Sequence, residues 1–401
     1  MKEARIMENK AFFVGFGRRD ITPQEVGIPL NGDLKLRDST GVQDPIYATC
    51  VAMKDAAGTE LLMYHIDLQN LMPQISYPII GRIAERTGVP KENITVTCTH
   101  MHRGPYNQHR SNAMIDRYNV LLNDQMIAAG VEALEDLKPA RMYTAHTHVE
   151  NGAFVRHYIQ ADGGYCGDQW AYSDAPVVGH AREADVHMQL VKFVREGGKD
   201  VVMMNWTGHV HYDGIKKTTI SADYVGAVRD YLEKETGCLF AFYQGAAGDQ
   251  NPRSRIPEEN RRADYIGYGQ RLGEHAQAAA YQEVDSANIQ VLKQTYEVEP
   301  ELNMWAITVG DVAFITAPYE MFSATGKYIK QESPFPTTFV ISYTNGYVGY
   351  MPNKEAYEFR QPDGTVMACY ETNCCNYVKG TAEILADKYV EMLKSLYPTR
   401  K

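Results

Sequence analysis

The 401-residue sequence has no long apolar run and no cluster of basic residues. Its first ten residues are charged, unlike a secretory signal, and no apolar run reaches the roughly 20 residues that a membrane-spanning helix needs. Acidic residues outnumber basic ones by 50 to 40, which gives a formal net charge of −10. Nucleic acids and anionic membrane surfaces attract basic proteins, so neither is an expected partner, and no stable membrane anchoring is expected.

Cysteine is scarce, with seven residues and no C-x-x-C spacing, which disfavours a cysteine-based zinc site. Cys374 and Cys375 are adjacent in the sequence. Cys50, Cys98 and Cys238 lie in or beside apolar runs, as reduced thiols in a protein core do. This usage is typical of a reducing compartment, and we predict a cytoplasmic location.

Internal repeats and low-complexity linkers are also absent, and strand-like runs alternate with helical periodicity along the whole chain. Strands are predicted at residues 12–16, 47–53, 60–65, 94–98, 141–146, 189–193, 201–206, 239–243, 306–309, 312–317 and 338–342. Helices are predicted at residues 75–87, 113–137, 224–236, 262–281, 321–331 and 381–396. The alternation predicts an α/β fold with mixed, twisted β-sheets flanked by helices, in a single domain over residues 1–401.

Two segments have little periodicity of either kind. Residues 152–178 are rich in Gly, Asp and Tyr, and residues 361–379 form a second irregular stretch. Long irregular segments within a compact domain are usually functional, so both are predicted to be functional loops.

A pair of histidines follows the predicted strand at residues 94–98. His100 and His102 are two residues apart, so on extended backbone they point to the same side, and Gly104-Pro105 then turns the chain. Catalytic groups in α/β sheets collect beyond the carboxyl ends of strands, and neutral imidazole is the commonest protein ligand for zinc. On its own, an H-x-H pair is also compatible with two ordinary polar loop residues.

Other strand ends carry further candidate ligands. His209 and His211 both follow the run at residues 201–206, and Glu320 follows the run at residues 312–317. Tyr350 lies in a Tyr/Gly-rich stretch after the run at residues 338–342. Each has a structural alternative, such as a turn, a helix-capping carboxylate or aromatic packing. Together they supply the neutral nitrogen and anionic oxygen ligands that a catalytic zinc uses.

Six short motifs, in order, resemble those of the neutral/alkaline, non-lysosomal ceramidase family. They are Gly15-Phe16-Gly17-Arg18-Arg19-Asp20-Ile21-Thr22-Pro23, Thr99-His100-Met101-His102-Arg103-Gly104-Pro105, Asn205-Trp206-Thr207-Gly208-His209, Gly248-Asp249-Gln250-Asn251-Pro252, Pro318-Tyr319-Glu320 and Asn345-Gly346-Tyr347-Val348-Gly349-Tyr350. The resemblance runs in register from about residue 12 to about residue 395. It implies a ceramidase-like catalytic domain.

The resemblance implies four ligands for a zinc ion (Zn²⁺): His100, His209, Glu320 and Tyr350. His102 would contact the reacting carbonyl or its oxyanion. Arg156 stands where the family has an arginine that contacts substrate, although Val155 replaces the asparagine that usually precedes it. His211 remains an alternative to His209, because both follow the same strand; the offset from Asn205 favours His209.

The sequence departs from the family pattern in ways that bear on substrate. Arg103 replaces a serine after the histidine pair, and neither a signal peptide nor the family's C-terminal β-sandwich is recognisable. We therefore expect a small, soluble, polar or anionic substrate rather than ceramide, with Arg103 or Arg156 as its anchor. The alternative for Arg103 is that it points to solvent or pairs with a neighbouring acid.

The sequence as a whole predicts a zinc-dependent hydrolase, and specifically an amidase. Two alternatives stay open. One is that the same metal site acts on an ester or a carbohydrate linkage, and the tyrosine-rich loops are suited to a sugar. A protein that kept the fold with a degenerate site would be a non-catalytic binding protein, but all four candidate ligands are present.

Overall fold

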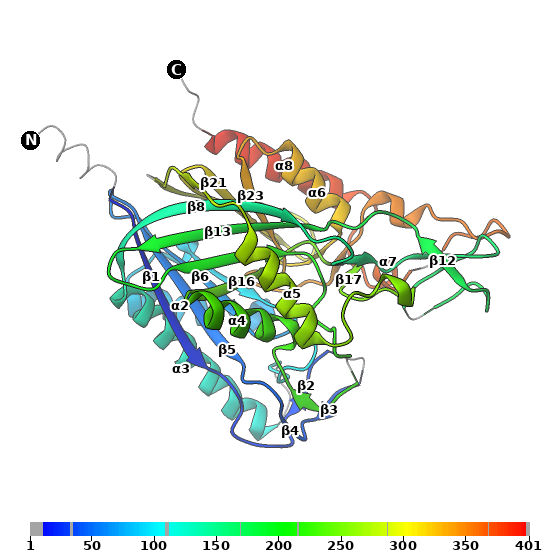
Figure 1. Ribbon diagram of the computed structural model, residues 1–401, viewed down its shortest axis with the longest axis horizontal. Coiled ribbons are helices and arrows are strands. Elements are labelled where there is room, and N and C mark those ends of the chain that lie inside the picture. The colour runs from blue at the N-terminus through cyan, green and yellow to red at the C-terminus, as the bar shows by residue number, and fades with distance from the viewer. Residues whose placement is uncertain are drawn as a thin grey trace, which may run out of the picture.

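The computed structural model describes residues 11–32, 35–108, 112–168, 170–214, 216–286, 288–367 and 369–397. Two β-sheets pack face to face, and helices cover the outer face of each, with α3 and α4 on one side and α6 and α8 on the other (Figure 1). The α/β fold with mixed sheets and flanking helices is therefore confirmed.

The larger sheet has strands in the spatial order β16 (Leu239–Gln244), β14 (Val201–Trp206), β13 (His187–Arg195), β8 (Lys138–His148), β1 (Phe13–Asp20), β5 (Tyr47–Lys54), β6 (Glu60–Ile66) and β7 (Ile94–Cys98), with β18 (Gln282–Val284) also paired to β8. Two pairs at its ends, β14 with β16 and β6 with β7, are parallel. The other pairs are antiparallel. The smaller sheet has the order β19 (Ile289–Tyr296), β20 (Leu302–Val309), β21 (Val312–Thr316) and β23 (Thr337–Ile341), and its last pair is parallel.

Short strand pairs build the loops at one end of these sheets. They are β2 (Pro29–Leu30) with β3 (Arg37–Asp38), β4 (Gly41–Val42) with β15 (Thr219–Ile220), β9 (Phe154–Val155) with β17 (Gln250–Asn251), β22 (Glu320–Met321) with β24 (Tyr350–Met351), and β10 (Tyr158–Gln160) between β11 (Tyr165–Cys166) and β12 (Val177–His180). The α-helices are α2 (Pro73–Thr87), α3 (Ala113–Glu135), α4 (Asp223–Thr236), α5 (Tyr265–Ala278), α6 (Ser323–Glu332), α7 (Tyr370–Asn373) and α8 (Thr381–Leu396). Within the described residues, the 3₁₀ turns are η1 (Lys91–Asn93), η2 (Pro257–Glu259) and η3 (Lys354–Tyr357).

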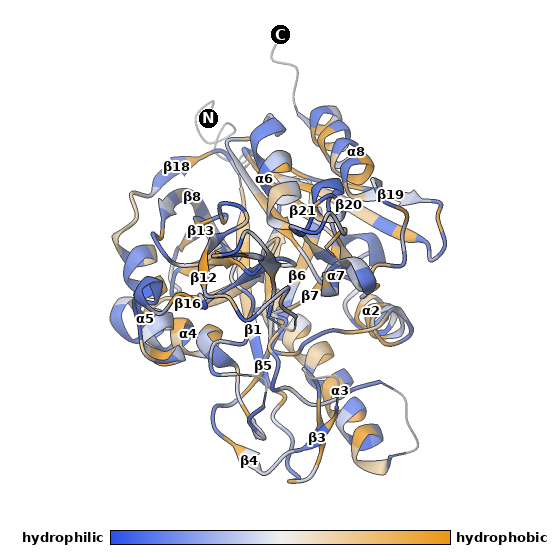
Figure 2. Cartoon of the chain, turned by 90° about the vertical axis from the view of Figure 1, so that its right-hand side faces the viewer, coloured by the Kyte–Doolittle hydropathy of each residue, from blue (hydrophilic) through white to orange (hydrophobic). Residues whose placement is uncertain are grey.

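Strand β6 shows how the layers share the core. Leu62 and Tyr64 belong to the core that the larger sheet forms with α2–α5. Leu61 and Met63, which point the opposite way, belong to the core between the two sheets together with Phe314 of β21. Helices α6 and α8 cover the far face of the smaller sheet, and α8 is apolar on one side and polar on the other (Figure 2). Burial on both faces explains why these strands read as continuous apolar runs.

The predicted element boundaries differ from the structure mainly at the ends. Strands β7 and β14 and helix α8 have the predicted bounds. Helix α5 begins later than predicted because the Asp264 carboxylate accepts a hydrogen bond from the Gly267 amide, 2.8 Å, and so caps the helix. The prediction of an irregular loop over residues 152–178 is wrong in part, since that segment holds β9, β10 and β11. Every helix that the structure describes is too short or too polar to cross a membrane.

Candidate metal centre

The centre lies where the carboxyl ends of parallel strands from both sheets meet. Strand β7 ends just before His100, and β14 ends just before the loop that carries His209. Beyond β23, the Tyr343 carbonyl accepts a hydrogen bond from the Cys98 amide, 3.1 Å, and the Ser342 amide donates to the Gln244 carbonyl, 2.9 Å. These bonds tie the ends of β7, β16 and β23 together, so residues distant in sequence face one another.

His100 has a strained backbone and a buried side chain. Its φ is +65°, a conformation that non-glycine residues rarely adopt and that is often kept at functional sites. Its Nδ1 lies 2.9 Å from the Gln69 carbonyl oxygen, and its ring stacks on Tyr343 with centroids 3.9 Å apart. The buried Nε2 has no hydrogen-bond partner among the described residues. A neutral imidazole that donates through Nδ1 leaves the Nε2 lone pair directed at the centre.

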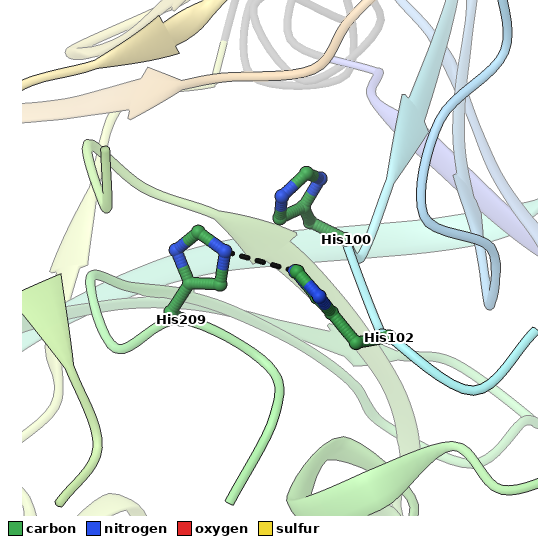
Figure 3. Close-up of side chains that lie close together, drawn as sticks. All are labelled: His100, His102 and His209. Atoms are coloured by element: carbon green, nitrogen blue, oxygen red, sulfur yellow. Dashed lines mark hydrogen bonds between the residues drawn. The ribbon is translucent and has the colours of Figure 1, made fainter. Parts of the chain in front are cut away.

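His102 and His209 approach each other from opposite sides (Figure 3). Their Nε2 atoms are 2.9 Å apart. The Nδ1 of His102 faces the Gly32 carbonyl at 2.8 Å, and that of His209 faces the Ala247 carbonyl at 3.1 Å. If both Nδ1 atoms donate to these carbonyls, two lone pairs face each other across the gap, and a cation or a proton there removes the repulsion.

Burial keeps all three imidazoles neutral. It lowers the pKa of His100 to about 3 and the pKa values of His102 and His209 well below their ordinary range. Neutral imidazole is the form that binds metal ions. One nitrogen from each of the three rings lies within 4.8 Å of the others.

Glu320 and Tyr350 add oxygen atoms to the same place. They are directly paired in the short parallel ladder of β22 and β24. Glu320 Oε2 lies 3.5 Å from His100 Nε2 and 4.0 Å from His209 Nε2. Tyr347 donates a hydrogen bond to Glu320 Oε1, 2.6 Å. Burial raises the pKa of the Glu320 carboxyl to about 7, although this hydrogen bond acts to lower it. Two nitrogens and a carboxylate oxygen thus converge, with the Tyr350 phenol beside them.

Arg156 is held next to this group by a buried ion pair. Its Nε donates to Glu371 Oε1, 2.7 Å, and its Nη2 donates to Tyr350 Oη, 3.1 Å, and to the Gly248 carbonyl, 2.8 Å. The other oxygen of Glu371 lies 3.0 Å from His157 Nε2. His157 and Glu371, with Cys369, form a second set of closely spaced potential ligand atoms. Because Arg156 occupies one Glu371 oxygen, we assign this set to the ion-pair network.

This network predicts a pH dependence of stability. Burial lowers the pKa of His157, but the charge of Glu371 and the hydrogen bonds to Glu371 and Cys369 together outweigh burial and bring the pKa to about 9, from an ordinary value of 6.5. Since the pKa is raised on folding, the pair stabilises the protein fully below pH 6.5, and this contribution is lost as the pH rises to 9. We expect the free energy of unfolding to fall over this range by on the order of 3 kcal/mol. Denaturant unfolding at several pH values measures the fall; His157→Gln is expected to flatten it, and an unchanged slope in the variant would contradict the assignment.

A cavity of about 560 Å³ opens onto the centre. Its charged and aromatic lining residues are His102, Arg156, His157, Asp168, Trp170, His211, Lys216, Glu320, Tyr347, Tyr350, Tyr370 and Glu371. The segment at residues 152–178 and the segment at residues 361–379 both contribute walls. Both segments were predicted from the sequence to be functional, but Asp168, Trp170 and Glu371 were not predicted as site residues.

The two histidines after β14 have different surroundings. His209 is fully buried and faces His102 and Glu320. His211 lines the cavity, and its ring centroid lies 5.2 Å from that of His102. His209 alone of the two belongs to the three-histidine group. This geometry favours His209 over His211 as a candidate ligand.

Arg103 lies away from the cavity. Its side chain is 2% exposed, its Nη2 lies 3.1 Å from Asp213 Oδ2, and its Nη1 donates to Gln43 and Thr219 at 3.1 and 3.2 Å. It is not among the residues that line the described cavity. The expectation that Arg103 anchors the substrate is therefore not met, because Arg103 pairs with a neighbouring acid instead. We leave Arg103 out of the proposed site.

Arg103 should consequently matter for stability. We expect Arg103→Met to lower the free energy of unfolding by about 1–3 kcal/mol, because buried polar partners lose their donors. Metal content should be unchanged. The matched control is Arg117→Met, which removes an exposed pair with Glu25 and should cost less than about 1 kcal/mol. Equal losses in the two variants, or loss of metal from Arg103→Met, would contradict this reading.

Comparisons with known proteins show the family and the fold. A family model described as neutral/alkaline non-lysosomal ceramidase, N-terminal, matches residues 12–258. A ceramidase solved in complex with C2 superposes with a TM-score of 0.77 at 16% identity, covering 98% of this chain and 76% of that one. A neutral ceramidase from Pseudomonas aeruginosa superposes with a TM-score of 0.70 at 16% identity, covering 97% and 75%. No curated protein matches the sequence. The chain belongs to the neutral/alkaline non-lysosomal ceramidase family, and this membership implies a hydrolase of amide bonds.

Proposed function

We propose that the protein is a zinc-dependent amidase that acts on a small, soluble, polar substrate. The observation that carries the proposal is the convergence of His100, His209 and Glu320, with Tyr350 beside them, at a cavity lined by charged and aromatic side chains. Membership of the ceramidase family supports amide hydrolysis by a metal-dependent enzyme.

The residues fit a zinc ion. The Nε2 atom of His100 is buried without a hydrogen-bond partner among the described residues, and His209 and Glu320 complete a set of two nitrogens and one carboxylate. Two histidines and a carboxylate are ligands that catalytic zinc sites use, and Tyr350 would be a fourth. A zinc ion held there would polarise a carbonyl and lower the pKa of water to about 7.

His102 is proposed to move the proton. Because its Nδ1 faces the Gly32 carbonyl, its Nε2 carries a lone pair and can accept a proton from the attacking water. The resulting imidazolium can donate a hydrogen bond to the oxyanion and then transfer its proton to the leaving amine. His102 thus keeps the contact with the oxyanion that the family resemblance implies, as the step that follows proton acceptance. Net hydrolysis adds water across the amide C–N bond and yields a carboxylic acid and an amine.

Arg156 is proposed to orient the substrate carbonyl or its polar head. It lines the cavity and contacts the Tyr350 hydroxyl, and Glu371 fixes its guanidinium in place. Such fixed positioning reduces the entropy lost on reaching the reactive geometry.

We also propose that residues 1–401 act as one domain. The candidate ligands come from both sheets: His100 and His209 follow strands of the larger sheet, and Glu320 follows β21 of the smaller one. Neither sheet alone carries the set. A reducing, cytoplasmic location remains part of the proposal, and the seven cysteines, all present as free thiols, are compatible with it.

A substrate screen on purified, zinc-loaded protein tests the proposed function. Soluble N-acyl amides are expected to be hydrolysed, and esters and glycosides of similar size to be poorer substrates. Detergent-solubilised ceramide should be turned over far more slowly than the best soluble amide, because the cavity lining is predominantly charged and aromatic. Preferred hydrolysis of ceramide would contradict the proposed substrate class, and preferred hydrolysis of esters or glycosides would contradict the proposed bond.

A further inference from the structure

A hairpin presents two side chains to the cavity. Residues Cys166 and Ala171 form a bridge, and the Gly167 amide donates to the Trp170 carbonyl, 2.9 Å. Asp168 and Trp170, which lie between the two bridged residues, both line the cavity. Neither residue has a part in the proposed chemistry at the metal centre.

Contacts within the protein hold the hairpin in place. Arg255 Nη1 donates to the Gly167 carbonyl, 2.9 Å, and Asn251 Nδ2 donates to Asp168 Oδ2, 2.5 Å. The Trp170 indole packs directly against Gly167, where an added Cβ would lie only 2.6 Å from the indole Nε1. A preorganised aromatic face and carboxylate reduce the entropy that ligand binding would otherwise cost.

The charges of the cavity lining are balanced. Arg156 and His157 are both paired with Glu371. The remaining charged side chains of the cavity wall are Asp168, Lys216 and Glu320, the last at the metal centre. No excess of one sign is available to select an anion or a cation. A neutral ligand rich in hydroxyl groups suits such a wall.

We propose that Trp170 and Asp168 form a subsite for a polyhydroxylated ring, so that the substrate is an N-acylated amino sugar or a conjugate that contains one. The apolar C–H face of a pyranose would stack on the indole, and its hydroxyls would donate to the Asp168 carboxylate. The N-acyl group would then extend toward His102 and Glu320. This inference rests on the proposed amidase function and names its substrate class.

Binding measurements test the subsite without turnover. N-acetylglucosamine is titrated into the full-length His100→Ala variant, with calorimetry and tryptophan fluorescence as readouts. Trp206 and Trp305 are buried, whereas Trp170 is partly exposed in the cavity wall, so a fluorescence change on binding is expected from Trp170. Adding Trp170→Ala should weaken binding roughly tenfold and remove the fluorescence change. Trp170→Phe should retain most of the affinity, and Asp168→Asn should weaken binding severalfold through loss of a charged acceptor.

Tyr172→Ala is the matched control, because Tyr172 is an exposed aromatic residue two positions along the same segment and outside the cavity lining. It should leave binding unchanged. Absence of N-acetylglucosamine binding, tighter binding of N-acetylglycine or of choline, or equal effects of Tyr172→Ala and Trp170→Ala would overturn the subsite.

Kinetic measurements on the active enzyme separate this inference from the proposed function. Trp170→Ala should raise KM for the sugar amide about tenfold and leave hydrolysis of a simple acetanilide unchanged. If acetanilide is hydrolysed and no sugar amide is, the subsite fails and the amidase stands; if the sugar binds and no amide is hydrolysed, the amidase fails.

Discussion

His209→Ala is expected to lose its metal and its activity together. His209 Nε2 lies among the candidate ligand atoms, 4.0 Å from Glu320 Oε2, so its removal leaves too few donors for tight zinc binding. A metal ion contributes several kcal/mol of transition-state stabilisation, and turnover should fall by at least about 10³-fold. Metal analysis after dialysis and steady-state kinetics measure the two effects.

The matched control for that variant is His211→Ala. His211 lies two residues further along, and its ring is 4.8 Å from that of His209, yet it stands in the cavity wall rather than in the three-histidine group. We expect it to keep one zinc per chain. If His211→Ala loses the metal and His209→Ala keeps it, the assignment of ligands after β14 is reversed.

His102→Ala is expected to keep its metal and lose roughly 10²–10³ in kcat, as removal of a general acid–base group does. Its Nε2 is 2.9 Å from that of His209, so the alternative that His102 is itself a ligand is geometrically close. Zinc content separates the two roles. The variant should also lose the limb of the pH–rate profile that reports on the proton acceptor. Loss of zinc from His102→Ala would make it a ligand and assign proton transfer to another group.

Much of the fold was predictable because buried strands have strong local signals. β7 and β14 are buried on both faces, and their unbroken apolar and threonine-rich runs gave their boundaries directly. The edge strand β19 was missed because most of its residues are exposed or partly exposed and polar. Segments with short strands, such as β9 and β10, lack enough residues for any period to be detected.

The candidate site likewise contains some residues that could be predicted from the sequence and others that could not. His100, His209 and Glu320 follow strong strands, so the strand ends marked them as candidates, while the preference for His209 over His211 came from the family resemblance. Glu371 was not, because its partner Arg156 is 215 residues away and nothing local in either segment specifies the pair. The burial of Arg103 against Asp213 was equally a tertiary outcome, since the sequence around Arg103 is the same whether it faces a substrate or an acid.

The most direct test of the central claim is a crystal structure of the zinc-loaded protein with anomalous diffraction recorded at the zinc edge. We predict one zinc per chain, with the Nε2 atoms of His100 and His209 about 2.0–2.1 Å from the ion and a Glu320 oxygen at a similar distance. An anomalous peak at His157, Cys369 and Glu371 instead, or no peak at the His100 site in a protein that hydrolyses amides, would contradict the account.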